Sequence, residues 1–187
     1  MKKQLLIMLA IFSVSFSAHS IVELRAGYGV QTPSDDEVGT NTLKSMSGFN
    51  LDAIVELPML PFGFGLRYED MGFDVGQLGG PDLTSSFQRT SLLINYRIID
   101  LFLYFGVIGS LGFVNDMNVD FGGGLEANWD SSLTYSVGVE GGVSFGLIMV
   151  GAELGYLSAN LEDADNLGNV DADLSGIYAK ALVGVGF

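Results

Sequence analysis

The sequence contains no cysteine and only one histidine, His19. The absence of cysteine excludes disulfide bonds and thiolate chemistry. His19 lies in an N-terminal segment that we expect to be removed, so the mature chain would lack a histidine for a general base, a Ser-His-Asp triad or a metal site. Histidine-dependent enzymes are therefore disfavoured, and only a site built from carboxylates stays open.

Long apolar runs are also lacking. The one run near the N-terminus, residues 5–16, follows two lysines and leads to the small residues Ala18 and Ser20. This is the arrangement of a secretory signal peptide cleaved after Ser20. We therefore predict a signal peptide over residues 1–20 and one domain over residues 21–187, in which no apolar run is long enough to form a membrane helix.

Basic residues are scarce. The chain has 8 Lys and Arg against 22 Asp and Glu, and the predicted signal peptide removes Lys2 and Lys3. Such an acidic excess repels phosphates, so we expect no nucleic-acid partner. The chain is nevertheless 48% hydrophobic and contains 26 glycines. How these residues are distributed along the chain decides the class of protein.

Eight segments alternate with a period of two residues, which is the pattern of strands with two unlike faces. One face carries bulky aliphatic and aromatic side chains, and the other carries glycine, serine and charged residues. The segments are 22–30, 49–57, 62–69, 89–98, 103–113, 133–144, 148–156 and 177–187. Three short connections (58–61, 99–101 and around Gly146) alternate with four long polar ones (31–47, 74–86, 114–132 and 159–175). Short turns at one end and long loops at the other are typical of bacterial outer-membrane barrels.

The eight segments predict an all-β protein, an eight-stranded antiparallel up-and-down transmembrane β-barrel. Such a barrel has an interior that side chains fill, which favours the glycine-rich polar face inside and the bulky face toward lipid. A soluble, lipocalin-like barrel would reverse the faces and expose most aliphatic residues to water. Aromatic residues near the strand ends predict two interface bands. These are Phe62, Tyr96, Phe145 and Phe187 at one end, and Tyr28, Phe49, Tyr68, Phe113, Tyr135 and Tyr156 at the other.

Charged residues of both signs lie on the predicted lumen face. They are Glu23, Arg25, Asp52, Glu56, Arg67, Glu69, Arg89, Arg97, Glu140, Glu153 and Lys180. Burying charge is costly unless the charges pair, so we expect a network of ion pairs that plugs the barrel. A narrow gated channel, in which a pair breaks and re-forms, is the alternative. Six apolar residues also fall on this face: Ile54, Leu93, Ile108, Met149, Leu157 and Leu182. All of them except Ile54 would support an apolar path.

The long loops hold nearly all the remaining acidic residues. In the last loop, Asp163, Asp165 and Gly168 match three positions of a calcium-binding EF-hand, but Leu167 and Leu174 occupy ligand positions. We therefore interpret this segment as a solvated acidic loop. Loose divalent-cation binding, bridging lipopolysaccharide phosphates, is a further hypothesis. We expect Trp129, in the third loop, to pack within the loop rather than contact a partner.

The sequence ends in the alternating strand Ile177-x-Ala179-x-Ala181-x-Val183-x-Val185-x-Phe187. With this ending and the eight-strand pattern, the chain resembles small outer-membrane barrels of the OmpA/OmpX type, and more loosely the OmpW-like family. The resemblance implies a location in the Gram-negative outer membrane. It also implies recognition by the barrel assembly machinery through Val183, Val185 and Phe187, and contact with membrane lipid and lipopolysaccharide.

Function is less constrained than architecture. We expect a monomeric, non-enzymatic outer-membrane protein with a plugged lumen, no cofactor and no metal. Its acidic loops would serve surface interaction, with a ligand that the sequence does not identify, or envelope integrity. The alternative is a narrow OmpW-like channel or carrier for small solutes. A lipid-modifying barrel enzyme is the third hypothesis.

Overall fold

The protein is described by a computed structural model that covers residues 21–34, 37–38, 41–43, 45–57, 60–76, 83–120, 126–130, 133–161 and 172–187. The predicted signal peptide, residues 1–20, lies outside the described residues and stays a prediction. None of the described segments is a helix long and apolar enough to cross a membrane.

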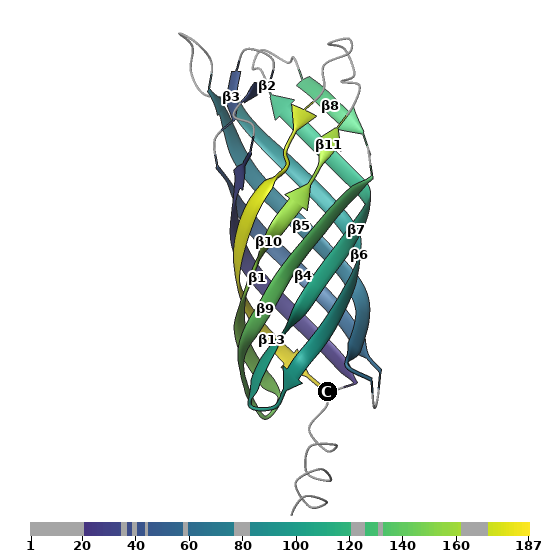
Figure 1. Ribbon diagram of the computed structural model, residues 1–187. Coiled ribbons are helices and arrows are strands. Elements are labelled where there is room, and N and C mark those ends of the chain that lie inside the picture. Colours follow the sequence, from purple (N-terminus) through teal and green to yellow (C-terminus); the bar gives the residue numbers. More distant parts are fainter. Residues whose placement is uncertain are drawn as a thin grey trace, which may run out of the picture.

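Eight long strands form the wall of a closed antiparallel barrel (Figure 1). In chain order they are β1 (Val22–Pro33), β4 (Met46–Glu56), β5 (Phe62–Gly76), β6 (Leu83–Asp100), β7 (Leu103–Asp120), β9 (Thr134–Phe145), β10 (Ile148–Ser158) and β13 (Gly176–Gly186). Each strand pairs with the next in this order, and β13 pairs back onto β1. The predicted eight-stranded up-and-down barrel is confirmed.

The first and last strands close the barrel along a continuous antiparallel ladder. Glu23 lies opposite Gly186, and the ladder continues to Pro33 opposite Gly176. At its lower end the Ile21 amide donates to the carbonyl of Phe187 at 2.6 Å. The three short turns lie at this same end, which we call the lower rim (Figure 1). The opposite end, where the long connections lie, is the upper rim.

Alternation along each strand separates an outer face from an inner one. On β13, Val183 and Val185 are exposed, whereas Tyr178, Lys180 and Leu182 are buried in the lumen. The predicted orientation, bulky side chains outward and polar ones inward, is therefore confirmed. The six apolar exceptions also point inward, as predicted: Ile54, Leu93, Ile108, Met149, Leu157 and Leu182 are all buried.

Aromatic side chains gather on the outer face toward both ends of the wall. At the lower end the rings of Phe62 and Tyr96 lie 4.9 Å apart, and at the upper end those of Phe49 and Tyr68 lie 6.1 Å apart. Phe102, in the lower turn between β6 and β7, adds to the lower group. Rings at these levels suit the two interfaces of a bilayer.

The strands extend further than the sequence pattern predicts. Five short strands fall within the predicted long loops: β2 (Glu37–Val38), β3 (Asn41–Leu43), β8 (Glu126–Asp130), β11 (Asn160–Leu161) and β12 (Ala172–Asp173). Strands β5, β6 and β7 also continue into the segments predicted as loops 74–86 and 114–132. These loop boundaries were wrong because backbone pairing continues through segments of mixed composition, in which Phe87, Met117 and Val119 still point inward. The predicted turn 99–101 is likewise shifted, since β6 includes Asp100 and the turn falls on residues 101–102.

Candidate functional site

The lumen holds all eleven charged residues that the sequence predicts there. None of them is more than 7% exposed. Strand alternation alone turns each side chain inward, whereas barrel closure decides which of them meet. They form two networks, one near the lower rim and one higher in the barrel.

The lower network consists of Glu23, Arg25, Glu56, Arg97 and Glu140. Arg25 contacts Glu23 at 2.5 Å and reaches Glu140 on β9 at 2.6 Å. Arg97 on β6 crosses the lumen to Glu23 on β1 at 2.7 Å and also contacts Glu56 at 3.0 Å. The two arginines therefore tie together four strands that are not all neighbours in the sheet.

Two further residues of the lower network are missing from the predicted set. Asp100 contacts Arg97 at 3.3 Å, and Asn95 donates its amide to Glu140 at 3.2 Å. Asp100 was assigned to a turn, so its orientation could not be read from alternation. The ring of Tyr104 lies 4.9 Å from the Arg97 guanidinium and provides a cation–π contact.

The upper network consists of Asp52, Arg67, Glu69, Arg89, Glu153 and Lys180. Arg67 lies between two carboxylates, Asp52 at 2.8 Å and Glu153 at 2.7 Å. Because Arg67 is on β5 and Glu153 on β10, this bond joins opposite walls. Planar guanidinium groups suit such two-sided carboxylate contacts.

Glu69 and Lys180 complete the upper network. Glu69 accepts from Arg89 at 2.7 Å and from Lys180 at 2.5 Å. Lys180 also lies 3.9 Å from Glu153, which links the two halves of the network. The network contains three basic and three acidic residues, so its formal charges balance.

Hydroxyl groups bond to several arginine and carboxylate atoms of the upper network. Arg89 donates to Thr134 at 2.7 Å and to Ser110 at 2.8 Å, and Ser110 is bonded to Ser136. The Tyr178 hydroxyl donates to Glu153 at 2.7 Å. Such additional bonds offset part of the cost of desolvating buried charge.

An apolar cluster fills the lumen near the upper rim, and we call it the apolar cap. Its buried members are Met46, Met71, Phe73, Phe87, Met117, Val119, Trp129, Leu157, Ala159, Leu161, Ala172, Leu174 and Tyr178. The sequence analysis missed the cap because most of these residues were assigned to loops. The same period of two, continued from Met71 to Phe73 and from Met117 to Val119, could have revealed it. Trp129 is predicted to pack within the third loop; it lies instead on β8 and packs in the cap among residues of other strands.

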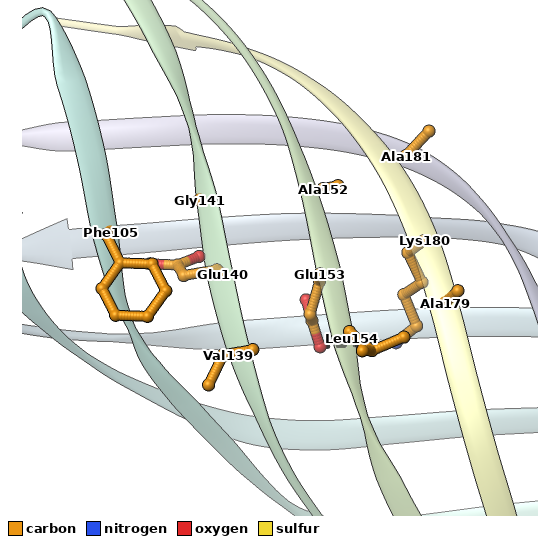
Figure 2. A pocket seen from close by; sticks show the side chains of 10 residues that line it. All are labelled: Phe105, Val139, Glu140, Gly141, Ala152, Glu153, Leu154, Ala179, Lys180 and Ala181. Atoms are coloured by element: carbon orange, nitrogen blue, oxygen red, sulfur yellow. Dashed lines mark ion pairs between the residues drawn. The ribbon is translucent and has the colours of Figure 1, made fainter.

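A shallow depression of about 490 Å³ lies on the outer wall over β9, β10 and β13 (Figure 2). It exists because Gly141, Ala152 and Ala181, which are aligned across the three strands, are small. Phe105 and Leu154 border it, and the side chains of three charged lumen residues lie behind the wall. The depression is therefore lined mainly by apolar groups of the outer surface.

The described residues contain no group of three or more Asp, Glu, His or Cys side chains that could hold a metal ion. Most of the last loop, including the EF-hand-like residues Asp163 and Asp165, lies outside the described residues. The hypothesis of divalent-cation binding by this loop thus stays a prediction.

Neither protein-family models nor curated protein sequences match the chain. Among solved structures, OprG of Pseudomonas aeruginosa superposes with a TM-score of 0.66 at 14% identity, covering 91% of this chain and 98% of that one. The Neisserial surface protein A gives 0.53 at 18% identity, with 89% and 96% covered. Ail of Yersinia pestis, solved with the heparin analogue sucrose octasulfate, gives 0.54 at 14% identity, with 90% and 97% covered.

These likenesses are too low in sequence identity to carry function, but they agree with the strand order and the closed wall. Each comparison protein is matched over nearly its whole length. The chain has the fold of the small eight-stranded outer-membrane barrels.

Proposed function

We propose that the protein is a non-enzymatic, monomeric outer-membrane barrel whose lumen is closed and whose acidic upper loops serve surface interaction or envelope integrity. The observation that carries the proposal is the two-layer filling of the lumen. Below, arginines and lysine bridge opposite walls through ion pairs such as Arg67–Glu153 at 2.7 Å. Above, the apolar cap packs around the fully buried Trp129 and Met117. An ion entering from either end would have to break one of these layers.

The location in the outer membrane is supported by the outer face. Bulky apolar residues from all eight long strands are exposed there, among them Leu24, Leu51, Phe64, Leu92 and Val137. A soluble protein rarely exposes so large a continuous apolar surface. A bilayer can cover this apolar surface. The backbone does not oppose insertion, because every backbone group of a closed barrel is already paired within the wall. Export by a signal peptide and assembly through Val183, Val185 and Phe187 belong to the same proposal.

Planar-bilayer recording tests the closed lumen. The wild-type protein and an outer-surface control, Asp116→Asn, should show no steady single-channel current. A variant that weakens both layers, Arg67→Ser with Glu153→Ser and Trp129→Ala, should begin to conduct. Steady current through the wild type would overturn the closed lumen, and silence of the folded triple variant would show that these layers are not what closes it.

The surface partner would be cationic. All basic residues of the described part of the chain, Arg25, Arg67, Arg89, Arg97 and Lys180, are turned into the lumen. The outward surface described above the apolar belt instead exposes acids such as Asp116 and Asp120. Charge complementarity therefore disfavours polyanions like the heparin analogue found with Ail and favours a basic ligand.

The apolar cap favours a second candidate function, a carrier for small apolar solutes. Its three methionines, Met46, Met71 and Met117, are adaptable side chains that can repack around a guest. Trp129 is the only tryptophan and lies in the cap, so it reports binding there. Saturable quenching of its fluorescence by 1-bromooctane would support a carrier. A control with Trp129→Phe and Phe113→Trp, which reports from the lipid-facing side, should quench without saturation.

A lipid-modifying activity is the least supported candidate. The carboxylates of the lumen are engaged in ion pairs and lie behind the wall, away from lipid. Mass analysis of lipid A from a deletion strain, compared with the parent, should show no change. A mass difference restored by the wild-type gene would contradict the non-enzymatic proposal.

A further inference from the structure

The short turns at the lower rim expose large apolar side chains. The β4–β5 turn exposes Leu60 (52%), the β6–β7 turn Leu101 (53%) and Phe102 (68%), and the β9–β10 hairpin Phe145 (69%) and Leu147 (61%). We call these five residues the turn ring. Turns that face water are normally built from glycine, asparagine, aspartate, serine and proline. The composition of the turn ring therefore needs an apolar neighbour outside the protein.

Charged groups near the lower rim are turned away from the turn ring. The segments that connect the strands there, residues 57–61, 101–102 and 146–147, contain no charged residue in the sequence. The flanking Glu56 and Arg97 are buried and paired with each other at 3.0 Å inside the lumen. Asp100 also bonds inward, to Arg97. The three turn segments themselves thus lack the charged side chains that would favour water, in contrast to the acidic upper end.

The length of the apolar outer face sets where the turn ring lies in a bilayer. On β9, Tyr135 of the upper aromatic band and Phe145 of the turn ring are ten residues apart. At about 3.4 Å per residue and a strand tilt of roughly 35–45°, this corresponds to a height of about 24–28 Å. The apolar band of bacterial outer-membrane barrels is about 25 Å tall. With Tyr135 at one interface, Phe145 therefore reaches the other.

The turn ring is continuous with the lipid-facing wall above it. Phe102 is followed on β7 by the exposed Leu103 and Phe105, and Leu147 is followed on β10 by the exposed Ile148 and Val150. At these two connections no polar residue separates the turn from the lipid-facing strand. The same apolar environment can therefore cover both without a second partner.

We propose that the turn ring is a lipid-binding surface, inserted among the glycerol and upper acyl groups of the inner, phospholipid leaflet. The inference rests on the proposed membrane-spanning barrel and adds to it the depth at which the barrel is held. The lower rim then ends within the leaflet, and the protein exposes a polar surface on the upper side of the membrane only. A periplasmic protein with an apolar face is the rival occupant, and it would require the turns to project into water when that protein is absent.

Site-directed spin labelling tests the proposal, because the cysteine-free chain allows one label at a time. Single variants Phe102→Cys and Leu147→Cys would be labelled with a nitroxide in phosphatidylethanolamine–phosphatidylglycerol vesicles. Collisions with oxygen report apolar surroundings, and collisions with a water-soluble nickel complex report water. We expect nickel collisions at both turn positions to be several-fold lower than at the exposed control Asp116→Cys.

A mid-wall control, Val139→Cys, distinguishes failure of the turn-ring proposal from failure of the membrane-spanning barrel on which it rests. Low nickel accessibility at Val139→Cys with high accessibility at both turn positions would overturn the insertion of the turn ring and leave the membrane-spanning barrel intact. High nickel accessibility at Val139→Cys as well would overturn the spanning barrel itself. Heat-dependent migration of each labelled variant in detergent gels verifies that the barrel has folded before labels are compared.

Discussion

Arg67 illustrates how single residues hold the lumen together. Its guanidinium is buried and contacts Asp52 at 2.8 Å and Glu153 at 2.7 Å. A buried ion pair gains little over an apolar replacement, yet removing one partner leaves an uncompensated charge in a medium that solvates it poorly. Removing Arg67 alone should therefore cost more stability than replacing Arg67 and its two carboxylate partners together by uncharged residues.

We expect Arg67→Met to lower the free energy of unfolding by about 3–5 kcal/mol, because Asp52 and Glu153 both lose the guanidinium group that pairs with them. Urea unfolding in lipid vesicles measures this loss. The matched control is the neutral triple variant, Arg67→Met with Asp52→Asn and Glu153→Gln. It should recover most of the lost stability, and a triple variant as unstable as the single one would contradict the ion-pair account.

At the scale of elements, the β9–β10 hairpin gives space to tyrosines from other strands. A Cβ atom on Gly142 or Gly151 would come within 3 Å of the Tyr104 ring, which extends inward from β7. Likewise, a Cβ atom on Gly138 or Gly155 would come within 3 Å of the hydroxyl oxygen of Tyr178, which extends inward from β13. The inward glycines of this hairpin are thus required by close approach, not by backbone conformation.

We expect Gly151→Ala to destabilise the barrel by about 1–3 kcal/mol, since the added methyl group would overlap the end of the Tyr104 side chain and lie 2.7 Å from the backbone carbonyl oxygen of Gly141. Gly109→Ala is the matched control, because a Cβ there meets atoms only at 3.5 Å or more. Urea unfolding in lipid vesicles should give a lower free energy of unfolding for Gly151→Ala than for Gly109→Ala. Equal stabilities would contradict the close packing of Tyr104 against β10.

At the scale of the whole molecule, charge is sorted by location. Within the part of the chain that the structure describes, every basic residue lies in the lumen, whereas acids such as Asp116 and Asp120 are exposed above the apolar belt. The basic groups serve internal pairing and are unavailable to external anions. Long-range attraction by this surface acts on cations alone.

Polylysine should accordingly bind the vesicle-embedded protein, and sucrose octasulfate should not. Isothermal titration calorimetry measures both. The binding of polylysine should weaken as ionic strength rises toward 0.15 M, where exposed charges are screened over about 8 Å. Salt-independent binding, or tight binding of the sulfated sugar, would contradict an acidic interaction surface.

Closure of the wall predicts resistance to detergent. All strands of the barrel pair on both sides, so no edge is open to unfolding by detergent at low temperature. Unboiled and boiled samples should migrate differently in detergent gels. Trp129 is buried in the apolar cap, so its fluorescence should shift to longer wavelength when the barrel unfolds. On heating, this shift should occur at the same temperature as the change in migration. Identical migration would contradict a closed barrel.

Strand identity and the facing of side chains could be predicted from the sequence, because a period of two depends only on local backbone geometry. The inward direction of Arg67 or Lys180 follows from its own strand. Predictions were wrong where the alternation passes through polar segments, so β8 and most of the apolar cap were assigned to loops. Asp100 was missed for the related reason that the end of β6 was placed too early.

The sequence by itself therefore determined the number of long strands, which face meets lipid and which charges lie inside, since each is a local property of one strand. Only the tertiary structure decided that Arg67 on β5 meets Glu153 on β10, and that Arg97 on β6 meets Glu23 on β1. These pairs join walls that become opposite only when β13 pairs with β1. The distance across the lumen is set by closing the sheet, and no single strand carries that information.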